Sequence, residues 1–314
     1  MQTHAETTSA AATILSGVRD ARFNQGVQCP RCGSLKTHRW GRFRGRQRYR
    51  CRGCSRTFSD LTGTPAAYIK KLHLWSAYAT CLQSSMSVRA SAAMLEINPT
   101  TSFRWRHRLL NHLVSRPETL IGWIEFATMR LPHSEKGRRP QDGQLAGHSG
   151  AALDSRERAP VTVVLAHDRT ANLFAAVCSS RPSAQELEKA FHERTTGRLH
   201  VCANEGHYGP FSRFARSLRG TYHDARGHRR PGTGPHDPLS HITNARQALV
   251  DLRDWMRRFH GVATKYLLNY LNWFIVLSRV VRRGLCAEIL RWPLTVASHK
   301  ARSTTRRNRK NVIS

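Results

Sequence analysis

The sequence predicts a multi-domain α/β protein in which a small cysteine-containing module is followed by a bundle of short helices and a mixed sheet with flanking helices. Three observations predict this order. Two Cys-x2-Cys pairs lie between residues 29 and 54, apolar residues recur at helical spacing between residues 72 and 112, and apolar and polar residues alternate from Thr119 onward. The expected parts are a tail (1–25), a cysteine module (26–62), a helical domain (66–116), an α/β domain (117–285) and a basic tail (286–314).

The cysteine module has the spacing of a zinc ribbon. Its two pairs, Cys29/Cys32 and Cys51/Cys54, are separated by eighteen residues, and four thiolates on two tight turns can hold one tetrahedral Zn²⁺. Gly33 falls where such a turn needs unusual backbone angles. Four free thiols or two disulfides are the alternative, which a reducing compartment and the duplicated spacing disfavour.

Basic and aromatic residues alternate within this module, and Asp60 is the acid between residues 29 and 60. An arginine-rich face there can contact phosphates, and Arg48 and Arg50 are the candidates. The alternative is a solvated basic surface over a minimal aromatic core, and both interpretations can hold together.

The helical domain begins after the breaker at residues 62–65. Apolar residues 72, 75, 78, 79 and 82 form one helical face, Ser87 is expected to cap a helix over 88–95, and Thr100 or Thr101 a helix reaching about His112. Two short helices, a turn and an arginine-bearing helix are typical of a helix-turn-helix, although a generic three-helix bundle has the same periodicity. Arg104, Arg106 and Arg108 are the expected DNA contacts. Arg104 and Arg108 share a face and Arg106 points elsewhere.

The α/β domain is predicted from alternating segments. Strands are expected at 120–127, 160–166, 172–178 and 199–203, with helices at about 183–193 and 209–218 and a further helix from Ala245. This order suits a ribonuclease-H-like mixed sheet with flanking helices.

The charge balance indicates a polyanionic partner. The 314 residues contain 51 Lys and Arg against 20 Asp and Glu, a formal net charge of +31. That excess disfavours a neutral metabolic enzyme and favours DNA or RNA as partner. The longest apolar run, 173–178, is too short for a membrane span, so we expect a cytoplasmic, nucleoid-associated protein with no membrane partner.

Several stretches resemble bacterial insertion-sequence transposases that carry an N-terminal zinc ribbon, a helix-turn-helix and a DDE (Asp-Asp-Glu or Asp-Asp-Asn) nuclease domain of ribonuclease-H-like fold. The resemblance runs from about residue 28 to 278, and its longest block is Trp-Met-Arg-Arg-Phe-His-Gly-Val-Ala-Thr-Lys-Tyr-Leu at 255–267. The other matching stretches are 48–54 with 57–58 and 61–65, 101–108, and 166–169. It implies double-stranded DNA with terminal inverted repeats as partner, allows a homo-oligomer, and adds Arg257, Arg258 and Lys265 as DNA contacts.

The resemblance also implies a Mg²⁺ site, but the three ligand positions carry other residues here. They fall on Ala127 in the first strand, Asn204 after the fourth strand and Arg246 in the segment His-Ile-Thr-Asn-Ala-Arg. Two-metal chemistry needs anionic oxygens. We therefore expect a catalytically degenerate transposase. Glu125 and Glu205 remain as fallback acids if the correspondence is shifted. The alternative function is a non-catalytic zinc-ribbon DNA-binding regulator, or repressor, of the parent element.

Overall fold

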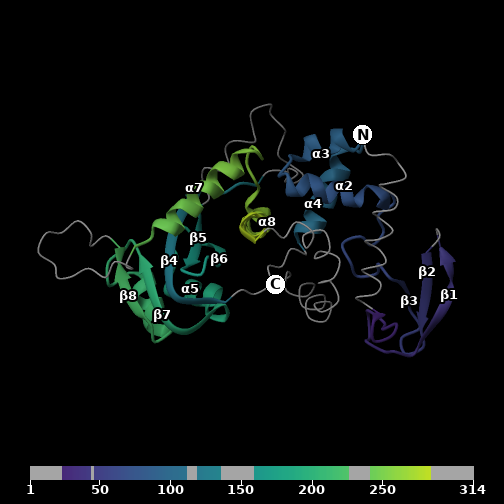
Figure 1. Ribbon diagram of the computed structural model, residues 1–314, viewed down its shortest axis with the longest axis horizontal. Helices are drawn as coiled ribbons and strands as arrows, with labels where there is room; N and C mark the ends of the chain where they lie inside the picture. Colours follow the sequence, from purple (N-terminus) through teal and green to yellow (C-terminus); the bar gives the residue numbers. More distant parts are fainter. Residues whose placement is uncertain (1–22, 44–45, 112–118, 136–158, 226–240, 284–314) are drawn as a thin grey trace, which may run out of the picture. The chain divides into compact units, whose positions relative to one another are not determined.

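The computed structural model describes residues 23–43, 46–111, 119–135, 159–225 and 241–283 (Figure 1). The chain divides into two compact units, one formed by residues 1–113 together with residues 279–314 and the other by residues 114–278. The cysteine module and the short helices thus belong to one unit, and the α/β domain forms the other. The expected terminal tails lie almost entirely outside the described residues.

The first unit begins with a three-stranded antiparallel sheet in the order β1-β2-β3, made of Thr37–Phe43, Arg46–Cys51 and Thr57–Ser59. A small core of Cys29, Cys51, Tyr49 and Phe58 lies beneath it. The Tyr49 and Phe58 rings stack 5.6 Å apart. So few apolar groups cannot stabilise a fold without a further crosslink, which a metal supplies in modules of this size.

Short helices complete the first unit. They are η1 (Leu72–Leu74), α2 (Trp75–Gln83), α3 (Val88–Met94) and α4 (Pro99–Leu110). The Ser87 side chain caps α3 as expected, accepting the Ala90 N–H at 3.1 Å. The expected cap of α4 is wrong: Asn98 accepts the Thr100 N–H at 2.8 Å. Pro99 explains the earlier start, because its fixed φ suits the first helical position.

The second unit contains a mixed five-stranded sheet in the order β6-β5-β4-β7-β8. The first strand in the chain, β4, pairs antiparallel with β5 and parallel with β7. This is the ribonuclease-H-like topology that the sequence predicts. The strands are β4 (Leu120–Leu131), β5 (Val161–Asp168), β6 (Leu173–Cys178), β7 (Thr195–Ala203) and β8 (Thr221–Asp224); the last of these is absent from the expected elements.

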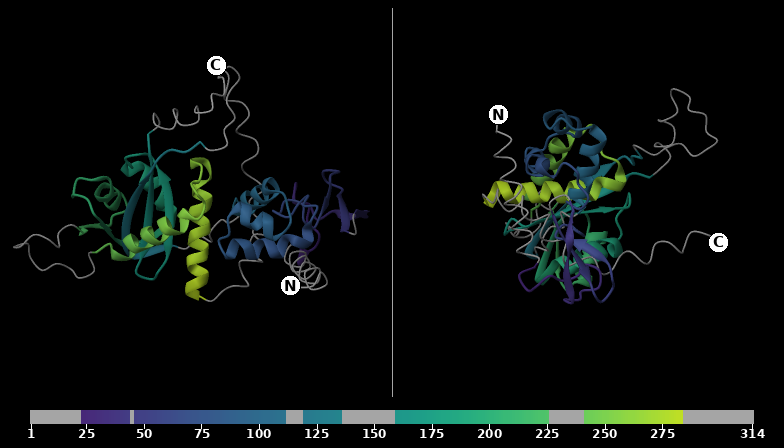
Figure 2. Two further views of the ribbon diagram at one scale, coloured as in Figure 1. Left: turned by 90° about the horizontal axis from the view of Figure 1, so that it is seen from above. Right: turned by 90° about the vertical axis from the view of Figure 1, so that its right-hand side faces the viewer.

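Helices cover the two faces of this sheet. They are α5 (Ala184–Phe191), followed by η2 (His192–Arg194), α6 (Pro210–Ser217) and α7 (Thr243–Arg257). The last helix, α8 (Thr264–Arg283), packs against α7. Phe126 of β4 packs against Phe191 of α5 and Phe214 of α6. Glu125, its neighbour on the opposite face, contacts α7. Figure 2 shows α7 and α8 running in different directions.

Aromatic side chains join α7 to α8. The ring of Trp255 lies 5.0 Å from Trp273, and Phe259 lies 5.0 Å from Tyr270. The start of α8 is tied to the end of β4, because the Thr264 N–H donates to the Ser134 carbonyl at 2.8 Å. No helix in the described ranges is long and apolar enough to cross a lipid bilayer.

Candidate metal centre and nucleic-acid interface

The four predicted cysteine ligands converge in the first unit. The Sγ atoms of Cys29 and Cys54 are 3.7 Å apart, those of Cys32 and Cys51 are 3.5 Å apart, and all four lie within 4.8 Å of one another. A tetrahedral Zn²⁺ with Zn–S bonds of about 2.3 Å places its sulfurs roughly 3.8 Å apart. The donor set therefore fits structural zinc.

Backbone groups form the turns of this cluster and donate hydrogen bonds that stabilise a thiolate. Gly33 has φ +75°, which allows the first knuckle to turn back, and its N–H donates to the Cys29 carbonyl at 2.9 Å. The Gly53 N–H donates to the Cys51 Sγ at 3.3 Å. Burial raises the pKa of Cys51, but hydrogen bonds from the Cys54 N–H, the Cys32 thiol and the Gly53 N–H together lower it to about 7. A thiol with a pKa in this range is largely ready to bind a metal near neutral pH.

The two candidate ribbon arginines are half-buried on β2. Arg48 donates from Nη2 to the Thr57 hydroxyl at 3.1 Å, and the Arg50 guanidinium lies 4.6 Å from the Trp40 ring centre. A groove of about 570 Å³ runs beside Arg48. Arg46, Lys70 and the exposed rings of Phe43 and Tyr68 also line it. This combination of cations and aromatic rings suits contact with a nucleic-acid strand.

The structure separates the three arginines of α4. Arg104 is exposed, as expected for a DNA contact. Arg108 is half-buried and donates from Nη1 to the Ala67 carbonyl at 2.8 Å. Arg106 is fully buried and donates from Nη2 to the Met86 carbonyl at 2.6 Å, so its expected role as a DNA contact is wrong. It lies on the face of α4 that packs inside the helical bundle.

The three basic residues proposed near the C-terminal helices are exposed. Arg257 pairs with Asp254 at 3.2 Å, and Arg258 follows the end of α7. Lys265 lies in the first turn of α8, its Nζ 5.0 Å from the Tyr266 ring centre. All three are therefore available to a polyanion at the surface of the second unit.

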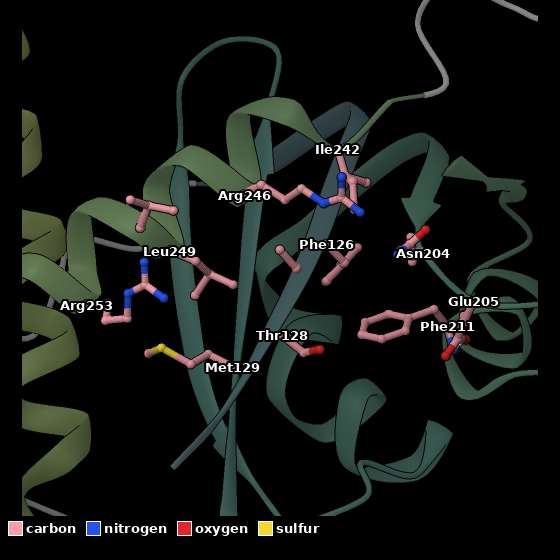
Figure 3. Close-up of a pocket in the computed structure, with 13 residues that line it drawn as sticks. Phe126, Thr128, Met129, Asn204, Glu205, Phe211, Ile242, Arg246, Leu249 and Arg253 are labelled. Atoms are coloured by element: carbon pink, nitrogen blue, oxygen red, sulfur yellow. Dashed lines mark hydrogen bonds between the residues drawn. The ribbon is translucent and has the colours of Figure 1, made fainter. Parts of the chain in front are cut away.

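The three positions that the resemblance assigns to Mg²⁺ line one pocket of about 500 Å³ in the second unit. Glu125 pairs with Cys202 in the parallel register of β4 and β7, so Ala127 lies level with Asn204, just beyond the end of β7. Arg246 enters from α7 (Figure 3). The pocket thus brings together a methyl group, an amide and a guanidinium.

The fallback acid Glu125 does not line this pocket, because its carboxylate anchors α7. The side chain is fully buried. Its Oε1 accepts hydrogen bonds from Arg169 Nη1 at 2.7 Å and Asn244 Nδ2 at 2.8 Å, and its Oε2 accepts from the Ala245 N–H at 3.0 Å. His241 lies beside the same group, 2.9 Å from Arg169 Nη1. We therefore replace the fallback interpretation of Glu125 with a structural one.

Glu205, the second fallback acid, does line the pocket, but its carboxylate faces the start of α6. Its Oε1 accepts the Phe211 N–H at 2.5 Å, in the position where an acid stabilises a helix N-terminus. A Cβ atom at Gly209 would overlap this carboxylate unless the Glu205 side chain moved. The lining offers one carboxylate, already hydrogen-bonded, and two guanidiniums, from Arg246 and Arg253. This donor set does not fit Mg²⁺, which requires several oxygen ligands.

Arg253, the second pocket arginine, is not among the site residues predicted from the sequence. It follows Arg246 by seven residues on α7, and helical residues at that spacing face the same way. The seven-residue spacing of the two arginines was visible in the sequence. It identifies Arg253 as a pocket residue only once the face of α7 that meets the pocket is known. Arg169 and Asn244, which hold Glu125, were also missed, since they are distant from it along the chain.

Comparisons with known proteins agree with this anatomy. Residues 11–57 match the transposase zinc-ribbon domain family. An uncharacterised protein in transposable element ISH50 of Halobacterium salinarum is 32% identical over 161 residues, which are 49% of this chain and 53% of that protein. The chain therefore matches about half the length of this relative. These two findings confirm the resemblance to insertion-sequence transposases.

Two solved structures of Mos1 also match, the strand transfer complex and a pre-cleavage transpososome. Each is 11% identical and covers 71% of this chain, with 74% and 78% of the respective Mos1 chains and TM-scores of 0.24 and 0.23. At those scores the likeness carries no weight for the fold, which rests on the strand order and pairing described above.

Proposed function

We propose that this chain is a DNA-binding transposase of an insertion sequence whose Mg²⁺-dependent cleavage site is degenerate. The observation that carries the proposal is the pocket shared by Ala127, Asn204 and Arg246. A ribonuclease-H-like sheet brings the ends of β4 and β7 to this point, yet the lining contains two arginines and one carboxylate that is already hydrogen-bonded to Phe211. A cationic pocket repels the divalent ions that strand cleavage needs.

Duplex DNA is the partner in this proposal, with the terminal inverted repeats of the parent element as the specific site. Structural Zn²⁺ on Cys29, Cys32, Cys51 and Cys54 holds the ribbon, and Arg104 of α4 is the candidate groove contact. The net charge of +31 supplies phosphate attraction independent of sequence. On the same ground, the proposal includes association with the nucleoid.

The test is a cleavage and binding assay on a duplex carrying the end of its own element. We expect a retarded complex and no nicked or joined product in either Mg²⁺ or Mn²⁺. Metal-dependent cleavage that disappears in Glu205→Gln would show that the fallback acid is catalytic and that the site is intact. Failure to bind any duplex at low salt would overturn the DNA-binding function itself.

A protein that binds element ends without cutting them can act as a repressor, which is the second candidate function. The observation that favours it is the same cationic pocket. Co-expression with an intact copy of the element should lower its transposition frequency, and variants that lose DNA binding should restore it. An unchanged frequency in the presence of the DNA-binding protein would contradict repression.

A further inference from the structure

We propose that the pocket between β4, β7 and α7 is a metal-independent clamp for the phosphates of a DNA strand, formed by Arg246 and Arg253. This inference rests on the proposed DNA-binding function and adds a site and a binding mode to it. The pocket would therefore hold the DNA backbone directly through guanidinium groups rather than through bridging cations.

The first step of the argument is that one face of α7 is aimed at the pocket. Arg246, Leu249, Val250 and Arg253 all contribute to the lining, and residues at these intervals form a single helical stripe. The two guanidiniums are the ends of the stripe, and apolar side chains separate them. Figure 3 shows Arg246 extending from α7 toward the side of the pocket where Asn204 lies, with Arg253 farther along the helix.

The second step is that Arg246 has no ion-pair partner among the residues that the structure describes. The ion pairs in the described ranges do not include Arg246, and its backbone N–H donates to the Ile242 carbonyl at 3.0 Å. Arg253 has a loose ion pair with Asp254 at 3.9 Å. The carboxylate of Glu205, the acid in the lining, already accepts the Phe211 N–H. The pocket therefore carries net positive charge.

The third step concerns ligand chemistry and access. A guanidinium binds phosphate oxygens through paired N–H donors, and the Asn204 amide offers a further N–H. Asn204, Arg246 and Arg253 are exposed, so an extended polymer can reach them without opening the fold. Seven helical residues separate the two arginines by about 10 Å along the helix axis, so each guanidinium can contact a different phosphate of one strand.

The test measures affinity for a labelled mixed-sequence duplex as a function of salt, without added divalent ions and in Mg²⁺ at matched ionic strength, with no chelator that would remove the structural Zn²⁺. The variants are Arg246→Ala, Arg253→Ala and the double change. Arg213→Ala is the matched control, since Arg213 is an exposed arginine on α6 that does not line the pocket. Arg246→Lys keeps the charge but loses the paired geometry.

Removing one phosphate contact should reduce the slope of log K against log salt by about 0.9, which is an approximately eightfold loss of affinity at about 0.1 M salt. In the double variant the salt slope should fall by about twice that amount. The affinity of Arg246→Lys should lie between those of wild type and Arg246→Ala, and the affinity and slope of Arg213→Ala should equal those of wild type. Omitting Mg²⁺ should leave the wild-type affinity unchanged. Zinc content and circular dichroism confirm that each variant is folded.

Two outcomes overturn the clamp while leaving the proposed function intact: an unchanged salt slope in the folded double variant, or an equal loss in Arg213→Ala. Wild-type affinity that requires Mg²⁺ also overturns it, because the phosphates would then be held by metal. No binding of wild type at low salt overturns both inferences. As a measurement independent of substitution, DNA should protect Arg246 and Arg253, but not Arg213, from an arginine-selective dicarbonyl reagent.

Discussion

At the scale of single residues, the cysteine cluster makes the sharpest prediction. Cys51→Ser should abolish the binding of one Zn²⁺ per chain, because a hydroxyl is a poor zinc ligand and Cys51 also accepts the Gly53 N–H. The ribbon should then unfold, since its core is too small to persist alone. Elemental analysis of protein purified without chelator measures the loss.

The control for this change is Cys81→Ser, which alters a buried cysteine outside the cluster. It should retain zinc whatever its effect on stability. Wild-type protein without zinc, or Cys51→Ser with a full equivalent, would disprove the assignment.

The arginines of α4 give a second residue-scale prediction, because burial divides them into two roles. Arg106→Ala should destabilise the first unit by roughly 2–4 kcal/mol, since it removes the hydrogen bond to Met86 and leaves a cavity. Arg104→Ala should leave stability unchanged and reduce the salt slope of DNA binding by about 1. Denaturant unfolding and salt-dependent binding measure the two effects.

Arg106→Met refines the interpretation, because methionine fills much of the same volume without the charge. If packing is the main role of Arg106, this variant should recover most of the lost stability. A stable Arg106→Ala protein with weakened DNA binding would show instead that the side chain reaches the ligand.

At the scale of elements, the attachment of α7 to the sheet depends on one buried carboxylate. Glu125→Gln should destabilise the second unit by roughly 2–3 kcal/mol, because Arg169 loses its ion pair and the Ala245 N–H loses a charged acceptor. The value is below the roughly 3–5 kcal/mol of a fully buried pair, since Arg169 keeps some exposure to water. Thermal unfolding measures the change.

The matched control is Glu193→Gln, at an exposed position outside this network, which should be neutral. Equal stability of the two variants would show that the hydrogen bonds from Asn244 and Ala245 do not need the charge. Because Arg246 follows directly on this anchored segment, Glu125→Gln should also weaken DNA binding if the clamp depends on the position of α7.

Element boundaries were predictable where local signals were strong. The Ser183 cap and Glu186 of α5 form a complete capping box, and the spacing of the cysteines identified their ligands. The edge strand β8 was not predictable, because four residues at 221–224 carry too little alternation and pair only through β7. The cap of α4 was mispredicted because several neighbouring polar residues can cap a helix. Pro99 at the first helical position makes Asn98 the cap.

At the scale of the whole molecule, the sequence predicted which positions meet but not what surrounds them. Ala127, Asn204 and Arg246 share a pocket as the resemblance implies, because strand order brings the ends of β4 and β7 together. The burial of Arg106 and Glu125 could not be predicted from the sequence, because each side chain is buried against a residue that is not its neighbour in the chain. That residue is Met86 for Arg106 and Asn244 for Glu125. Long-range contacts of this kind leave no periodic signal.

The final prediction restores carboxylates to the pocket. The triple change Ala127→Asp, Asn204→Asp and Arg246→Glu should bind Mn²⁺ or Mg²⁺ measurably by titration calorimetry, whereas wild type should not, because clustered anionic oxygens replace a methyl group, an amide and a cation. The double change that keeps Arg246 should bind more weakly, since a guanidinium in the pocket opposes a divalent ion. The triple variant should simultaneously lose DNA affinity in the absence of divalent ions and regain part of it in Mg²⁺, exchanging a guanidinium contact for a metal-bridged one. Equal metal binding by wild type and the triple variant would show that these three positions do not form the ion site.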